Sequence, residues 1–206
     1  EVVKTLTSGI AGLFKKPTFG SFHGTGRITA ADQVKVTTAD GGAPVVLTAE
    51  NILIATGSHR ETTRDEVSAR FGAELASKAT IVVHDCRDES SLVSAGTLPS
   101  GGELVLNRLV VDCDLLVAEG FIEPHFFAGY SGGRKAVLPG VAGYATVLAN
   151  HCAEFIADDR SRTGVLDGNP IHKDMMYAVR AVKLAFILNV VIDADKHVIA
   201  AFAGHR

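Results

Sequence analysis

The sequence lacks the features that mark several common protein classes. Its three cysteines include no C-x-x-C pair, which argues against a disulfide framework and a structural zinc site. No signal peptide is visible, and no apolar run approaches the roughly 20 residues of a membrane helix. The net charge is −3, and acidic and basic residues are interspersed, so no basic cluster is visible that would bind nucleic acid or an anionic membrane. We therefore expect a soluble, cytoplasmic protein that binds small molecules.

What the chain does contain is enough apolar sequence for a sizeable core. With 206 residues, 47% of them hydrophobic, it can build one large or two small domains. The sequence begins with Glu rather than Met, and apolar residues at helical spacing start within its first few positions. We therefore expect a fragment or a processed form.

The first quarter of the chain predicts a helix followed by a small antiparallel β-meander. Apolar residues between Val3 and Phe14 recur at helical spacing. Short strand patterns then cover residues 18–26, 33–38 and 44–50, with a hairpin signal at 39–42. Residues 51–57 form a short apolar run that ends in glycine, which is typical of a buried parallel strand.

The remainder alternates strands and helices. Thr63 and Glu66 form a capping box before a helix, and strands are predicted at 80–84 and 114–119. Further predicted elements are a strand pair within 92–105, helices at 107–112, 142–158 and 172–182, and a hairpin from 186 to 202. The alternation predicts an α/β fold, a Rossmann-like open sheet with flanking helices.

A glycine-rich loop between residues 123 and 140 is the strongest candidate site. Gly129, Gly132 and Gly133 permit close approach of the backbone to a ligand, and Arg134 and Lys135 add positive charge, a combination that suits a phosphate. The loop is not a Walker A motif, because an alanine follows the lysine where Ser or Thr would bind Mg²⁺. The plainer alternative is a basic turn that joins a strand to a helix.

One histidine lies within this loop and another follows it. His125 lies ten residues before the lysine and His151 sixteen residues after it, so one imidazole could serve as acid or base and another as a metal ligand. The residues alone leave these roles interchangeable. We interpret His84 and His172 as structural, with His172 also a candidate cap or supporting group for the site.

These segments resemble the nickel-dependent lactate racemase family. The resemblance runs from about His59 to Arg206 and is carried by residues 55–60, 121–140, 150–151, 162–172 and 186–191. It implies reversible hydride transfer between a 2-hydroxy acid such as lactate and a nickel pincer nucleotide, a pyridinium-3,5-bisthiocarboxylic acid mononucleotide supplied by cofactor-synthesis proteins.

The resemblance also implies roles for single residues. His59 and His125 match the two acid–base groups, Lys135 matches the lysine that tethers the cofactor, and His151 matches the nickel ligand. Neutral imidazole suits Ni²⁺. The loop glycines 129, 132 and 133, with Arg134, are expected to cradle the cofactor phosphate.

Residues 1–58 resemble a different family. Their pattern is similar to an internal piece of the FAD domain of dihydrolipoamide dehydrogenase, which suggests a chimera joined at the strand that ends in Ala55-Thr56-Gly57. We do not expect FAD binding, because the Gly-x-Gly-x-x-Gly fingerprint and the paired redox cysteines are missing. The predicted domains are residues 1–58 and 59–206.

Three functions follow as alternatives. The leading one is a racemase-like protein that is impaired as this chain, because the family's own N-terminal segment is replaced and its C-terminal domain is not found before Arg206. The second is an FAD-binding fragment of a pyridine nucleotide-disulfide oxidoreductase. The third is a non-catalytic α/β scaffold.

Overall fold

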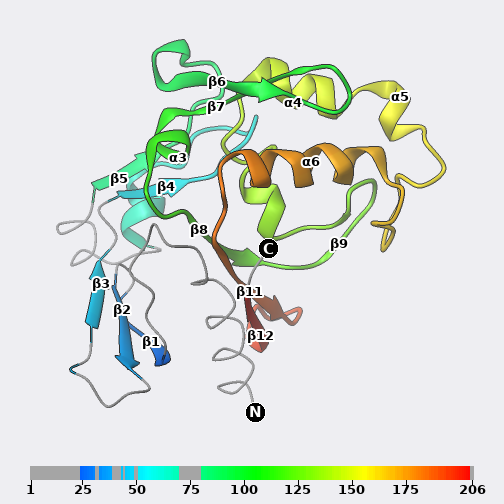
Figure 1. Cartoon of the computed structure of the whole chain (residues 1–206). Coiled ribbons are helices and arrows are strands. Elements are labelled where there is room, and N and C mark those ends of the chain that lie inside the picture. Colours follow the sequence, from blue (N-terminus) through cyan, green and yellow to red (C-terminus); the bar gives the residue numbers. More distant parts are fainter. Residues whose placement is uncertain are drawn as a thin grey trace.

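The structure is a computed structural model that describes residues 24–30, 33–38, 43, 45–48, 51–69 and 80–204. The amphipathic helix expected between Val3 and Phe14 lies outside these residues. Within them, elements follow the predicted order closely (Figure 1).

The predicted β-meander is confirmed. Strands β1 (Gly24–Ala30), β2 (Gln33–Thr38) and β3 (Val45–Thr48) form an antiparallel sheet in that order. Of the strand expected over residues 18–26, only 24–26 are described, and β1 continues beyond them to Ala30.

The next strand delivers a loop at its carboxyl end, as predicted. Strand β4 (Asn51–Ile54) pairs in parallel with β5 (Thr80–Val83). It ends before the expected Gly57, which takes a positive φ of 59° in the following turn. The capping box is present as well, because the Thr63 N–H donates to Glu66 Oε2 at 2.8 Å and the Glu66 N–H to Thr63 Oγ1 at 3.2 Å. A helix over residues 64–69 follows.

A hairpin and a short helix come next. The 3₁₀ turn η1 (Glu89–Ser91) leads into β6 (Leu92–Thr97), which pairs antiparallel with β7 (Glu103–Asn107). Helix α3 (Arg108–Asp112) begins at once because the Asn107 side chain caps it by accepting from the Leu109 N–H at 3.0 Å.

The second half carries the central loop and the longest helix among the described residues. Its elements are β8 (Val117–Phe121), β9 (Pro124–His125), β10 (Gly129–Tyr130), the 3₁₀ turn η2 (Gly133–Ala136), α4 (Tyr144–Asn150), α5 (Ala153–Ile156), α6 (Pro170–Ala181), β11 (Phe186–Ile192) and β12 (Val198–Gly204).

One expected helix is in fact two. The pattern predicted a continuous helix over 142–158, but α4 ends at Asn150 and α5 begins at Ala153, because Cys152 has an extended backbone at φ −70° and ψ 158°. The break leaves His151 at the end of α4 rather than within a helix.

The α/β class is confirmed. Strand β8 pairs in parallel with β11, and β12 pairs antiparallel with β11, which gives the order β12-β11-β8. The described strands form several small sheets. A single Rossmann-like open sheet across them stays a prediction.

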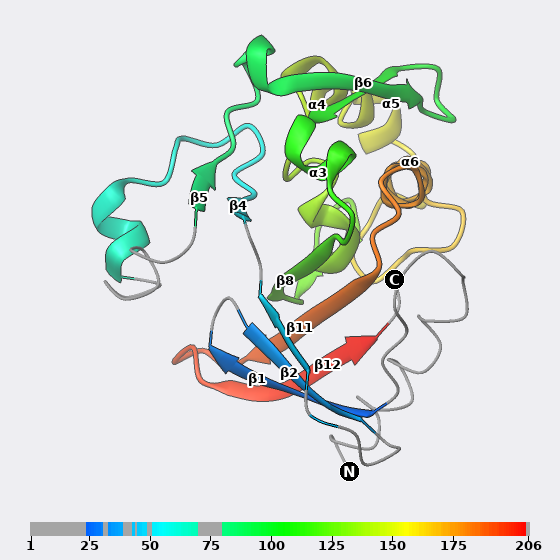
Figure 2. The same ribbon diagram turned by 60° about the vertical axis from the view of Figure 1, so that its left-hand side comes forward.

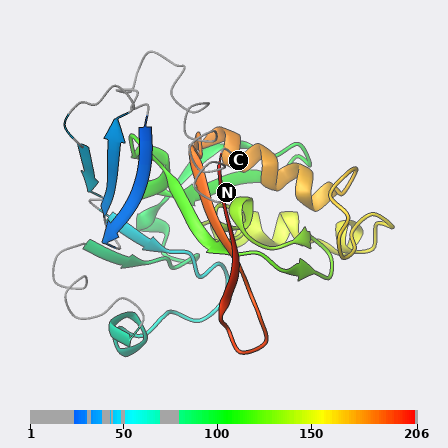
Figure 3. The same ribbon diagram turned by 90° about the horizontal axis from the view of Figure 1, so that it is seen from below.

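One core lies between the β6–β7 hairpin, α3, α4 and α6. Figure 2 looks along α6 and shows these elements gathered around a shared interior. Its largest fully buried apolar side chains are Leu104, Leu106, Leu138, Ile171, Met175, Val179 and Leu184. The β11–β12 hairpin projects from this body, as Figure 3 shows. Val198, Ile199 and Phe202 of β12 are exposed. None of the helices in the described part of the chain has the length and apolarity needed to cross a bilayer.

Candidate functional site

The central loop is closed by its own backbone. Strands β9 and β10 form a two-residue antiparallel ladder in which His125 lies opposite Gly129. Ser131 seals the base of the loop, because its N–H donates to the Glu123 carbonyl and its hydroxyl accepts from the Glu123 N–H, both at 2.9 Å. The loop therefore presents His125 from a fixed turn rather than from a free segment.

Lys135 reaches back to that histidine. Its Nζ lies 2.9 Å from His125 Nε2, and the Ala128 N–H donates to His125 Nδ1 at 3.2 Å. Because Nδ1 accepts a hydrogen bond from the backbone, a neutral His125 carries its own proton on Nε2. The Nε2–H group faces Lys135 Nζ, which can accept a hydrogen bond from it only as an uncharged amine.

The surroundings of Lys135 make its neutral amine more accessible than that of an exposed lysine. Burial lowers the pKa of Lys135 to about 8, with the nearby Arg134 charge as a further cause, while Glu123 opposes the shift. Burial also lowers the pKa of His125, and the charges of Lys135 and Arg134 act in the same direction. A pKa of about 8 leaves most of the Lys135 amine protonated at pH 7 and about half of it neutral at pH 8, where it is a nucleophile beside a neutral imidazole.

Phe127 joins this pair to a second histidine. The Phe127 ring meets His125 edge-on at 4.6 Å and His151 edge-on at 5.0 Å between ring centroids. Phe126 stacks on His125 at 4.8 Å and 12° and also meets Phe127 edge-on at 4.5 Å, and it is 74% exposed. The site is therefore an aromatic cluster that opens to solvent at Phe126.

His151 is the second imidazole of the cluster, and its ring chemistry suits a metal ion. Burial lowers its pKa to about 4, assisted by the charges of Lys135 and His125, so the imidazole is neutral at physiological pH. Its Nδ1 is buried and has no hydrogen-bond partner among the described residues. A neutral ring with an unpartnered nitrogen is the form that binds Ni²⁺. Together with the Lys135 amine, it fits a metal-bearing group attached through a lysine.

The loop glycines have packing roles of their own. Gly129, Gly132 and Gly133 have φ values of 80°, 76° and 47°. A Cβ on Gly129 would lie 2.5 Å from the Val165 carbonyl oxygen, and one on Gly132 would lie 3.2 Å from the Asn189 side chain. The expectation that these glycines bind a phosphate stays a prediction.

Arg134 holds the loop from within. Its guanidinium donates to the Ala128 carbonyl at 2.7 Å and to the Tyr130 carbonyl at 3.0 Å. Burial lowers its pKa to about 10, and its Nε is buried without a hydrogen-bond partner in the described part of the chain. His172 at the start of α6 has a pKa lowered to about 4 by burial and then by the charges of Arg134 and Arg180, and its Nδ1 is likewise unpartnered.

His59 lies apart from this cluster. It is exposed after β4, in a pocket of about 630 Å³ that Thr56, Arg60 and Glu66 also line. Its loop is tied to the central loop by one bond, from the Gly57 N–H to the Gly140 carbonyl at 2.8 Å. No hydrogen bond or ring contact within the described ranges joins His59 to His125. The structure thus brings together three of the four predicted chemical residues, namely His125, Lys135 and His151.

Two asparagines that support the site were missed by sequence reasoning. Asn169 caps α6 and also donates to the Phe127 carbonyl at 2.9 Å. Asn189 is 4% exposed in β11 and accepts from the Gly133 N–H at 3.3 Å. An Asn-Pro pair at a helix start and a lone amide in an apolar strand are signals that could have found them. His84, interpreted as structural, is buried and hydrogen-bonded to the Ala142 carbonyl at 3.0 Å.

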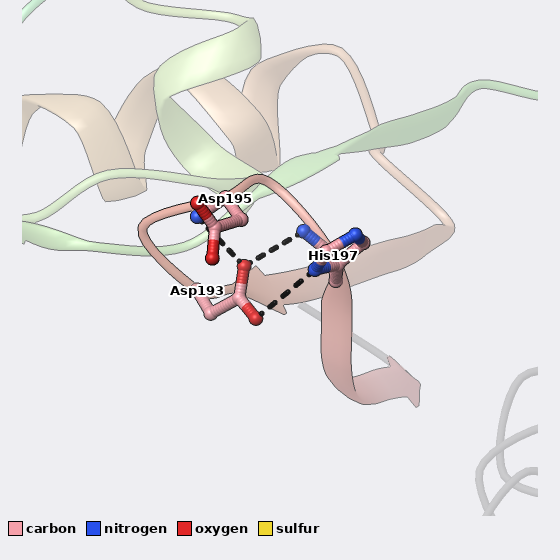
Figure 4. A group of neighbouring side chains, drawn as sticks. All are labelled: Asp193, Asp195 and His197. Atoms are coloured by element: carbon pink, nitrogen blue, oxygen red, sulfur yellow. Dashed lines mark hydrogen bonds and ion pairs between the residues drawn. The ribbon is translucent and has the colours of Figure 1, made fainter.

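Three side chains of types that can bind a metal ion lie together at the tip of the β11–β12 hairpin. Figure 4 shows Asp193, Asp195 and His197 in this exposed turn. The Asp193 carboxylate accepts from the Asp195 N–H at 3.0 Å and from the His197 N–H at 2.8 Å, so it shapes the turn. Since the turn accounts for the grouping, we assign no ligand to it.

Comparisons with known proteins place most of the chain in one family and its first part near another. Lactate racemase of Thermoanaerobacterium thermosaccharolyticum is 60% identical over 154 residues, which cover 75% of this chain and 36% of that protein. The solved structure of the same organism's lactate racemase apoprotein aligns with a TM-score of 0.74 at 59% identity, over 75% of this chain and 37% of that chain. The chain thus spans about a third of the length of these relatives.

The resemblance of the first part to a flavoprotein is confirmed too. Dihydrolipoyl dehydrogenase of Rattus norvegicus is 55% identical over 58 residues, which cover 28% of this chain and 11% of that protein. The exact junction near residue 58 stays a prediction.

The family model described as the lactate racemase N-terminal domain matches residues 45–164, a range that contains His125, Lys135 and His151. Because the match covers more than half of the chain, the chain belongs to the lactate racemase N-terminal domain family.

Proposed function

We propose that this chain carries the cofactor-attachment and proton-transfer part of a lactate, or 2-hydroxy acid, racemase. The observation that carries the proposal is the contact between Lys135 Nζ and His125 Nε2 at 2.9 Å, inside a cluster that also holds the unpartnered His151. A nucleophilic lysine, an acid–base imidazole and a free metal-binding imidazole are the groups that this reaction takes.

Racemisation of a 2-hydroxy acid has to break the bond between Cα and its hydrogen. A side chain cannot remove that hydrogen as a simple proton, because it is too weakly acidic. When bound, the nickel pincer nucleotide supplies an acceptor that takes up the hydrogen as hydride and returns it to either face. The protein's own residues then have to hold this group and to move the hydroxyl proton.

Each residue of the cluster has one task in this proposal. Lys135 attaches the cofactor through its amine, and His151 ligates nickel through a ring nitrogen. His125 is the first acid–base group. Acylation of Lys135 frees Nε2 from its contact with the amine, and the ring accepts the hydroxyl proton at Nε2 as the tautomer that carries its own proton on Nδ1, which gives up the Ala128 hydrogen bond. His59 is proposed as the second acid–base group, for the opposite face of the substrate.

The proposal for His59 needs movement of its loop or further parts of the site, since His59 lies apart from the cluster. No described residue is assigned to the substrate carboxylate. We therefore expect the isolated chain to take up cofactor and to racemise lactate weakly or not at all.

The test is to co-produce the chain with the cofactor-synthesis enzymes and to measure its intact mass and nickel content. We expect a covalent adduct and bound nickel in the wild type and neither in Lys135→Ala. The matched control is Lys173→Ala, because Lys173 is an exposed lysine on α6. A folded wild-type chain without adduct or nickel would overturn the proposal and leave a racemase-derived scaffold.

A further inference from the structure

The His151 ring is held by few interactions of its own. Its Nδ1 has no hydrogen-bond partner among the described residues, and its one ring contact is the edge-on Phe127 at 5.0 Å. The direction of the ring therefore depends on the backbone that carries it. That backbone is the end of α4, where the His151 N–H donates to the Val147 carbonyl at 2.9 Å.

The residue just before His151 is anchored firmly. The Asn150 side chain is completely buried, and its Nδ2 donates to the Ile171 carbonyl of α6 at 3.2 Å. The same Nδ2 donates to Asp174 Oδ2 at 3.5 Å. The last turn of α4 is thereby fixed against α6 at the position next to His151.

Asp174 extends this anchor to a third element. Its carboxylate, on α6, is 1% exposed and accepts from the Ser100 hydroxyl at 2.6 Å and from the Ser100 N–H at 3.2 Å. Ser100 lies in the turn between β6 and β7. No cation in the described part of the chain pairs with this carboxylate, so neutral donors alone offset the cost of burying it.

A buried carboxylate held in this way is a costly means of packing two helices. Apolar side chains of the same volume often fill such an interface at equal or better stability. What a hydrogen-bonded network adds is a single defined orientation of the groups it joins. The group that gains an orientation here is the neighbour of Asn150, the unpartnered His151.

We propose that Ser100, Asp174 and Asn150 form a positioning network that aims the His151 imidazole into the cluster with Phe127. This inference rests on the proposed function, because the direction of His151 matters through its binding of nickel. Residues that orient a metal ligand without touching the metal have this kind of role in other metal sites.

The first test follows the His151 ring protons by NMR in protein without cofactor. The ring current of Phe127 acts on these protons, so they report the position of the imidazole. We expect Asn150→Ala to shift them. The matched control is Thr146→Ala, one turn earlier in α4, because Thr146 is also buried and also anchors the helix, by donating to the Glu103 carbonyl at 2.7 Å. We expect this control to lower stability and to leave the His151 resonances in place.

A milder variant covers the case in which Asn150→Ala does not fold. Ser100→Ala removes one donor to Asp174 at an exposed turn, and we expect a smaller shift of the His151 protons in the same direction. Unmoved His151 resonances in both variants, or in the one that folds, would overturn the inference. So would an equal shift in Thr146→Ala.

The second readout is nickel retention after co-production with the cofactor-synthesis enzymes. We expect Asn150→Ala to lose nickel to a chelator about 10-fold faster than the wild type, and Thr146→Ala to stay within about twofold of it. An unchanged rate in Asn150→Ala would contradict the inference. If the wild type takes up no nickel, the proposed function fails, and the ring resonances alone decide whether the network positions His151.

Discussion

At the scale of single residues, the chemistry of the site depends on the charge of one amine. Lys135 is half-buried, and burial lowers its pKa to about 8. At pH 8 the Lys135 amine is therefore uncharged in about half of the protein molecules. A lysine of ordinary pKa, near 10.4, has about a hundredfold less neutral amine there. We therefore predict that Lys135 is acylated by a limiting amount of a small acylating reagent with a titration midpoint near pH 8. Competition labelling followed by peptide mass spectrometry measures this midpoint.

The reference is a short lysine peptide added to the same sample, because an ordinary lysine has a pKa near 10.4. We expect the labelling of this peptide still to be rising where that of Lys135 has levelled off. A Lys135 midpoint at or above that of the peptide would contradict the neutral-amine interpretation of the contact with His125.

At the scale of elements, the start of α6 supports the site most directly. The Asn169 side chain accepts from the N–H groups of Ile171 and His172 and donates to the carbonyls of Phe127 and Val165. Asn169→Ala removes a helix cap, worth about 1 kcal/mol, and leaves carbonyls without a donor. We predict a loss of about 2–4 kcal/mol in the free energy of unfolding, measured by urea denaturation.

Thr63→Ala is the comparison that separates capping from support of the loop. Thr63 caps the helix over residues 64–69 at an exposed position and makes no bond to the central loop. We expect it to cost about 1 kcal/mol or less. Equal losses in the two variants would mean that Asn169 acts as a cap alone.

The individual strands and helices show which parts of the fold could be predicted from the sequence. Strands with clear period, such as those within 92–105 and 186–202, and the capping box at Thr63 were predicted well because local pattern determines them. The break between α4 and α5 was missed, since the apolar spacing continues across His151 and only the extended backbone of Cys152 interrupts it.

The site was predicted only in part for a related reason. The glycine-rich loop and its histidines are contiguous enough to be recognised, and the structure brings Lys135 to His125. The support from Asn169 and Asn189 comes from residues that lie 42 and 56 positions from their partners in the loop. Nothing in local spacing reports such contacts, because they arise only when α6 and β11 pack on the loop.

At the scale of the whole molecule, buried histidines make stability depend on pH. Burial is the first cause of a lowered pKa at His84, His125, His151 and His172, and the values for the last two fall from 6.5 to about 4. Below pH 6.5 the unfolded chain therefore binds protons that the folded chain does not, so stability rises with pH in this window. We predict that the free energy of unfolding is largest above pH 6.5 and falls steadily towards pH 4.

Urea denaturation across this window measures the slope, and one variant tests its origin. His172→Gln removes a histidine whose ring nitrogen is buried without a partner, so it should flatten the fall between pH 6.5 and about 4. His197→Gln is the matched control, because the His197 side chain is 76% exposed in the β11–β12 turn. A slope that His197→Gln alters as much as His172→Gln would show that burial of histidine is not what makes the protein sensitive to acid. Acid sensitivity that is traced to His172 would instead tie the stability of the whole chain to the packing of α6 on the central loop.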